Sequence, residues 1–243
     1  GKNMGRAYEV RKASIAKTAA KKSKVYSRYG KELYMAAKQG VPDPEMNVEL
    51  ARLIEEARDH EEPNHVIEKA IEKAKGGGGE DYHASRYEGF GPGESTVIVE
   101  CLTDNDNRTV SEVRNCFTKS NGKMGVSGSV SHSYLHAGVL SFKHDSLETV
   151  FEGVLEAGLE PIDIEEEEGY ILLTVEPQDL HKTRTVLEEM IEGIKFDMAE
   201  IRYLPLDYVK LDESEVSDFE KLLSMLDECE DVQQVYHNVM LEN

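Results

Sequence analysis

Four consecutive glycines, Gly76 to Gly79, divide the chain into two parts with different periodicities. A run of glycines has no side chains to pack and forms a flexible connection. Before it, apolar residues recur three and four positions apart, as they do in helices that bury one face. After it, short β-branched runs alternate with helical patterns. The sequence therefore predicts a helical segment followed by domains that combine helices and sheet.

The segment before the glycines predicts helices only. Val25, Tyr29 and Leu33 stand at helical spacing and indicate the buried stripe of one helix. Pro63 fits the first turn of a later helix, because that turn leaves its N–H groups unpaired and proline has none to lose. We therefore expect a small helical bundle over residues 1–75.

Beyond the glycines, residues 136–205 have the strand and helix order βαββαβ, which is typical of ferredoxin-like units. Asp145 is expected to cap the first helix of that unit. Residues 96–103 predict an earlier strand, and residues 129–135 a return strand after the next helix. A last helix and strand, over residues 211–239, have no sheet of their own and can complete the sheet of the earlier strand.

The predicted fold class is α+β with three domains. A helical basic domain is expected at residues 1–75, followed by two α/β domains with ferredoxin-like βαβ units. The middle domain is discontinuous and comprises residues 80–135 plus 206–243, and the βαββαβ domain at 136–205 is inserted into it. Each sheet is expected to bury one face under its helices and to leave the other face free.

Charge is distributed unevenly along the chain. The first forty residues hold eleven Lys and Arg against Glu9 and Glu32, whereas the other residues hold 17 bases against 46 acids. An acidic body repels polyanions, so a basic head on it predicts a local contact with the phosphate backbone of DNA or RNA. A basic helix face that is merely solvated is the alternative. The candidate contact residues are Arg11, Lys12, Lys17, Lys21, Lys22, Lys24 and Arg28.

Two glycine-rich loops provide a second set of candidates. Residues 87–93 and 121–129 are rich in backbone donors, and such loops can hold phosphate or ribosomal RNA. The spacings of known phosphate loops are absent, however, and simple turns are the alternative interpretation. The secondary candidates in and near these loops are Gly91, Asn107, Arg108, Lys123, Ser127 and Ser129.

The sequence contains no constellation typical of catalysis. Its three cysteines are scattered, and three histidines between residues 132 and 144 lie in a strand pattern that suits a metal poorly. We therefore expect a non-enzymatic protein with no metal and no cofactor. The few cysteines and the lack of a long apolar run predict a cytoplasmic protein, with no membrane partner, for which we favour a monomer. The cysteines are Cys101, Cys116 and Cys229.

Three segments and the C-terminus resemble the YebC family, which includes bacterial YebC-type regulators and the mitochondrial translational activator of cytochrome oxidase. The segments read YEGFGPG at residues 87–93, ECLTDNDNRT at 100–109 and MGVSGSV at 124–130, and the C-terminal stretch reads VQQVYHN at 232–238. Near the N-terminus, GRAYEV at residues 5–10 departs from the start of the main branch and is more similar to a second bacterial branch.

The resemblance implies the same fold, with a helical N-terminal domain and a discontinuous middle domain. It also implies non-enzymatic control of gene expression, as a DNA-binding transcriptional regulator. The alternative is a translation factor on the ribosome, which relieves stalling at proline-rich stretches and contacts rRNA or tRNA. Either role needs a phosphate contact, which the basic head could supply. A third hypothesis is a protein-interaction scaffold that docks partners on free sheet faces.

Overall fold

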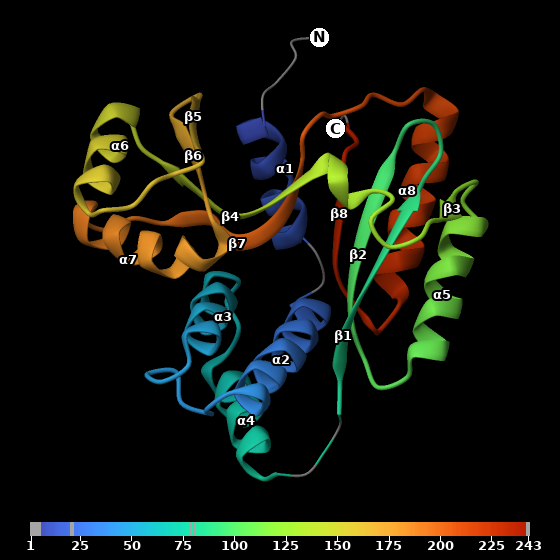
Figure 1. Cartoon of the computed structure of the whole chain (residues 1–243), viewed down its shortest axis with the longest axis horizontal. Helices are drawn as coiled ribbons and strands as arrows, with labels where there is room; N and C mark the ends of the chain where they lie inside the picture. Colours follow the sequence, from blue (N-terminus) through green and yellow to red (C-terminus); the bar gives the residue numbers. More distant parts are fainter. Residues whose placement is uncertain (1–5, 20–21, 78, 80, 242–243) are drawn as a thin grey trace. The chain divides into compact units, whose positions relative to one another are not determined.

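The structure is a computed structural model that describes residues 6–19, 22–77, 79 and 81–241 (Figure 1). Its strands form two four-stranded sheets, and the predicted α+β class is confirmed. The α-helices are α1 (Arg6–Ala19), α2 (Lys22–Gln39), α3 (Val48–Asp59), α4 (Asn64–Lys75), α5 (Asp106–Thr118), α6 (Leu147–Glu156), α7 (Leu180–Met190) and α8 (Glu213–Glu228). The strands are β1 (His83–Phe90), β2 (Thr96–Thr103), β3 (Lys123–Met124), β4 (Tyr134–Lys143), β5 (Asp163–Glu167), β6 (Tyr170–Val175), β7 (Phe196–Pro205) and β8 (Val232–His237).

The chain forms two compact units. The first unit combines residues 1–79 with residues 136–202, and the second combines residues 80–135 with residues 203–243. The helices α1 to α4 therefore belong to the same unit as the βαββαβ segment. The predicted boundaries between three domains stay a prediction.

In the helical part of the first unit, the predicted stripe of α2 is buried: Val25, Tyr29 and Leu33 are at most 8% exposed. The turn after α2 is held by Asn47, the N-cap of α3. Its side-chain oxygen accepts a hydrogen bond from the backbone N–H of Leu50 at 3.0 Å. A capping oxygen of this kind satisfies an N–H group that the first helical turn leaves unpaired.

The sheet of the first unit has the strand order β5-β6-β4-β7, which is that of a ferredoxin-like βαββαβ unit. Apolar residues of α6 and α7 pack with one face of this sheet to form a core. The buried members of this core are Leu140, Phe142, Val150, Val154, Leu159, Ile171, Leu173, Val175, Leu180, Leu187 and Ala199. The first helix of the βαββαβ segment, α6, is capped by Ser146 and not by Asp145. The Ser146 hydroxyl accepts the N–H of Thr149 at 3.2 Å.

The second face of this sheet is buried as well. Successive residues of a strand point to opposite faces, so Leu172 lies opposite its core neighbours Ile171 and Leu173. Leu172 is nevertheless 1% exposed. On β4, Val139 alternates with the core residue Leu140 in the same way and has no exposed surface. The expectation of a free sheet face is therefore wrong for the first unit.

The N-terminal helices account for this burial. α1 contacts β5 and β6. At the end of α3, Nε2 of His60 lies 3.1 Å from Oε1 of Glu200 on β7. Asp59 accepts two hydrogen bonds from the guanidinium of Arg184 on α7, at 2.6 and 2.8 Å. The face that the scaffold hypothesis required in this unit is occupied by the chain's own helices.

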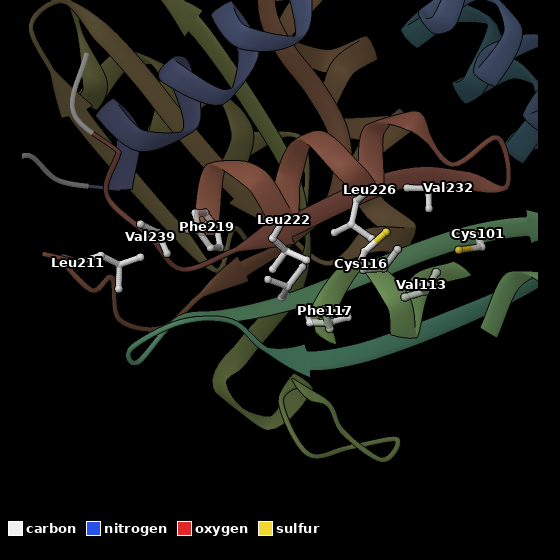
Figure 2. Close-up of a cluster of buried hydrophobic side chains, with 12 residues drawn as sticks. Cys101, Val113, Cys116, Phe117, Leu211, Phe219, Leu222, Leu226, Val232 and Val239 are labelled. Carbon is white, nitrogen blue, oxygen red and sulfur yellow. The ribbon is translucent and has the colours of Figure 1, made fainter. Parts of the chain in front are cut away.

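The second unit has the strand order β3-β1-β2-β8, and every pair in this sheet is antiparallel. Because β8 pairs with β2, the C-terminal helix and strand complete the earlier sheet, as the sequence predicts. Helices α5 and α8 pack on one face of this sheet (Figure 2). The buried members of this core are Val97, Val99, Cys101, Val113, Cys116, Phe117, Leu211, Phe219, Leu222, Leu226, Val232 and Val239.

The opposite face of the second sheet is also partly covered. Ile98 is fully buried there and packs with Val130, Tyr134 and Tyr236. The return strand predicted at residues 129–135 is wrong, because most of that stretch is a turn and the short 3₁₀ helix η1 (Ser131–Ser133). The sheet face that was expected to be free is thus covered around Ile98 by the segment that contains Val130 and Tyr134.

Gly89 of β1 has no room for a side chain. A Cβ at this position would lie 2.5 Å from the ring of Phe117 and 3.0 Å from the backbone oxygen of Lys123. We expect Gly89→Ala to lower the free energy of unfolding by about 2 kcal/mol, because overpacking displaces buried neighbours. Urea unfolding followed by circular dichroism measures the change.

The control is Gly30→Ala in α2, where a Cβ meets nothing within 4 Å and alanine should stabilise the protein by about 0.5–1 kcal/mol. Destabilisation by both substitutions to the same extent would contradict the steric argument.

Candidate nucleic-acid interface

A basic stripe runs along α2 in the first unit. Lys24, Arg28 and Lys31 are spaced four and three residues apart, so they share one face of the helix. All three are partly exposed, and each also interacts with other groups of the protein. We call these three residues the α2 stripe. Lys31 is not among the sequence candidates, although the same helical spacing identifies it.

Lys22 begins α2 and has no acidic residue beside it in the first turn. Its Nζ lies 3.2 Å from Oε2 of Glu61, and the two side chains are 68% and 75% exposed. The hydrogen bond to Glu61 raises the pKa of Lys22. Lysines are unfavourable near the positive end of a helix, whereas anions are favoured there. The charge of Lys22 thus lies at the positive end of α2, and Glu61 offsets part of it.

The candidates on α1 have different surroundings. The guanidinium of Arg11 lies 3.5 Å from the ring centre of Tyr170 on β6, so Arg11 packs α1 onto the sheet. Nζ of Lys12 lies 5.6 Å from the ring centre of Tyr8, one turn earlier on the same helix. Arg11 is thus a packing residue as well as a cation.

Two of the seven candidates have no described side chain. Lys17 belongs to α1, but its side chain lies outside the description. Lys21 lies outside the described residues altogether. Of the seven, Lys22, Lys24 and Arg28 fall within the first two turns of α2. These three, together with Lys31, form the best-defined cationic surface among the candidates.

Glu88 organises the glycine-rich loop after β3 in the second unit. Its carboxylate accepts backbone N–H groups from Gly128 at 2.7 Å, Val130 at 3.0 Å and Ser131 at 2.6 Å. Burial raises the pKa of Glu88, but these N–H groups outweigh it and leave the pKa below its ordinary value. Glu88 is therefore a buried carboxylate anion at neutral pH, and it occupies donors that a phosphate would need.

The secondary candidates separate into two groups. The engaged group comprises Arg108, Ser129 and Gly91. Arg108 donates to both carboxylate oxygens of Asp231, Ser129 donates to a backbone oxygen at 2.6 Å, and the Gly91 N–H donates within its own turn at 3.0 Å. The group exposed to solvent comprises Asn107, Lys123 and Ser127. Three of the six secondary candidates therefore make structural hydrogen bonds, and the other three remain accessible to a ligand.

Sequence reasoning missed the role of Glu88. The sequence shows this glutamate inside a glycine-rich stretch that reads as a turn, whereas the structure places it in β1. An acidic residue inside a strand hairpin is the only local signal, and it does not identify the loop it holds. Among the described residues, no three His, Cys, Asp or Glu side chains are placed to hold a metal ion. No helix within the described ranges is long and apolar enough to cross a membrane.

Two family models match the chain over most of its length. The model of the TACO1/YebC N-terminal domain matches residues 6–77, and the model of the second and third TACO1/YebC domains matches residues 82–239. The chain belongs to the TACO1/YebC family. The resemblance seen in the sequence motifs is thereby confirmed.

Relatives of this YebC-family chain align with nearly its whole length. A protein of Pseudoalteromonas translucida, named a probable transcriptional regulatory protein, is 50% identical over 241 residues, which are 99% of this chain and 100% of the relative. A protein of the same name from Vibrio vulnificus is 50% identical and covers 97% of this chain and 99% of its own length. The crystal structure of a conserved hypothetical protein from Aquifex aeolicus is similar, with a TM-score of 0.78, 35% identity and 94% of each chain covered.

Proposed function

We propose that this YebC-family protein is a non-enzymatic regulator of gene expression that binds the phosphate backbone of duplex DNA through the α2 stripe and Lys22. The observation that carries the proposal is the arrangement of Lys24, Arg28 and Lys31 on one face of α2, in a chain whose formal net charge is −20. Such a local cationic surface binds a polyanion that the rest of the protein repels. A cytoplasmic location and a monomeric state belong to the same proposal.

Duplex DNA is the preferred partner because the relatives are named probable transcriptional regulatory proteins. A contact made by lysine and arginine to phosphates carries no sequence information by itself. The α2 stripe therefore accounts for affinity, and selectivity for particular sites would need further contacts. Ribosomal RNA presents the same phosphate chemistry, so the ribosome is the alternative partner.

Reversing the charge of the α2 stripe should abolish most of the binding. We expect Lys24→Glu combined with Arg28→Glu to weaken binding to a random-sequence DNA duplex by about tenfold or more at moderate salt, because each lost phosphate contact also loses its counterion release. Fluorescence anisotropy with a labelled duplex measures the affinity. The control is Lys143→Glu combined with Lys182→Glu. Both lysines are exposed and lie outside residues 1–75, and the double substitution changes the net charge by the same amount.

The same variants test the alternative partner. Co-sedimentation with ribosomes is compared with anisotropy on duplex DNA at one salt concentration. Ribosome binding without DNA binding would overturn the DNA assignment and place the phosphate contact on rRNA. If the stripe variant and the control bind equally well, the α2 stripe is not the contact surface.

A further inference from the structure

Two cysteine thiols lie side by side in the second unit. Sγ of Cys116, in the last turn of α5, is 3.7 Å from Sγ of Cys229, the residue that ends α8. A disulfide bond is about 2.05 Å long, so the two sulfurs are within side-chain movement of bonding. Cys229 adopts an extended backbone at the C-cap of α8, where its N–H donates to the backbone oxygen of Leu226. The third cysteine, Cys101, belongs to the same core (Figure 2).

A surface pocket gives reagents access to the pair. The pocket has a volume of about 380 Å³, and both Cys116 and Cys229 line it, together with Met225. Cys116 is 2% exposed, whereas Cys229 is partly exposed. Small molecules that enter the pocket can therefore reach both sulfurs without unfolding of the core.

The electrostatic surroundings select the kind of reagent. Glu112, Glu228 and Glu230 line the same pocket. The only cation among the lining residues, Arg108, is already bonded to both oxygens of Asp231. Anionic reagents are thus repelled from the pocket, and neutral ones are not.

The hydrogen bond between the two thiols shifts their pKa values in opposite directions. The hydrogen bond with Cys229 lowers the pKa of Cys116, while burial and the neighbouring Glu112 oppose that shift. The same hydrogen bond and burial raise the pKa of Cys229. Cys116 is therefore the sulfur that ionises first and acts as the nucleophile, because the thiolate is the reactive form.

We propose that Cys116 and Cys229 form a modification site at which a small neutral oxidant such as hydrogen peroxide creates a disulfide bond. The Cys116 thiolate attacks one peroxide oxygen, the O–O bond breaks, and hydroxide leaves. Cys229 then attacks the sulfur of the Cys116 sulfenic acid, the S–O bond breaks, and water forms. Two thiols lose two electrons and two protons, and one peroxide becomes two water molecules. The bond ties the end of α8 to α5.

Peptide mapping of the full-length protein tests the site. After mild peroxide treatment and alkylation of unreacted thiols, we expect a linked peptide pair that contains Cys116 and Cys229, and alkylated Cys101. The melting temperature of the oxidised protein should rise by about 5 °C, because the link closes a long loop of the unfolded chain, and a thiol reductant should reverse the rise. The variant Cys101→Ser should behave like the wild type, whereas Cys229→Ser should form no link.

Two aromatic disulfides test the charge selection. Neutral dithiodipyridine should oxidise the pair at least about tenfold faster than the dianion dithiobis-nitrobenzoate at low salt, and the ratio should shrink at high salt. A linked peptide that contains Cys101, oxidation of single cysteines without a link, or faster reaction with the dianion would overturn the proposal. Peptide mapping of the wild type decides this even if a variant fails to fold.

Discussion

Replacing Glu88 by alanine is expected to lower the free energy of unfolding of the second unit by about 4 kcal/mol. The carboxylate accepts three backbone N–H groups, and hydrogen bonds to a charged group contribute about 1.5–3 kcal/mol each, with losses in one network that do not add fully. Val130 is itself buried, so its N–H group would stay without a partner. Urea unfolding followed by circular dichroism measures the loss.

Glutamine at the same position is the matched control. Glu88→Gln keeps the shape and one acceptor oxygen but places an NH₂ group against backbone donors, so we expect a smaller loss of unfolding free energy, of roughly 2 kcal/mol.

Because the pKa of Glu88 is lowered in the folded protein, the contribution of its charge to stability is complete above the ordinary glutamate pKa of about 4.3. The contribution disappears as the pH falls through the lower folded value. The stability difference between the wild type and Glu88→Gln should therefore shrink below about pH 4. A difference that persists unchanged at low pH would mean that the charge of Glu88 contributes nothing.

Replacing Leu172 by alanine is expected to destabilise the first unit by about 3 kcal/mol. Leu172 is 1% exposed on the sheet face that α6 and α7 do not cover, and truncation of a buried leucine leaves a cavity. The control is Leu155→Ala on α6, where the leucine is 44% exposed and the loss should stay below about 1 kcal/mol. Thermal melts and urea unfolding measure both variants.

The pair of leucine variants discriminates between two views of the sheet. If the second face were free, as the sequence pattern predicts, Leu172→Ala would be nearly neutral, like Leu155→Ala. A large and specific loss at Leu172 supports burial under the N-terminal helices. It also predicts that removal of residues 1–75 destabilises the βαββαβ segment, even though four glycines follow the helices.

Local signals in the sequence were sufficient for the elements with strong periodicity. Val25, Tyr29 and Leu33 identified the buried side of α2 because their spacing follows the helical repeat. Pro63 indicates the start of a later helix, and α4 begins at the next residue, Asn64. These features depend on residues within one or two helical turns of each other, so they can be predicted from the local sequence.

Features that depend on distant neighbours were not predicted. Residues 87–93 favour a turn in the sequence, whereas the structure extends β1 to Phe90, with the polar side chains of Arg86 and Glu88 in the strand. Their partners are supplied by Tyr203, whose hydroxyl lies 2.6 Å from a nitrogen of Arg86, and by the loop at residues 128–131. Arg11, a candidate phosphate contact, also packs on the ring of Tyr170, far along the chain. Contacts between residues so far apart in the sequence produce no periodic pattern of residue types, so the sequence alone does not indicate them.

The salt dependence of DNA binding tests the central claim most directly. The slope of log affinity against log salt concentration is compared for the wild type, for Lys24→Glu with Arg28→Glu, and for Lys143→Glu with Lys182→Glu. Each phosphate contact on duplex DNA contributes about 0.9 to this slope. We predict that the stripe variant loses affinity and that its slope flattens by roughly one to two units, whereas the control keeps the wild-type slope. An unchanged slope and affinity in the stripe variant would contradict a phosphate contact on α2.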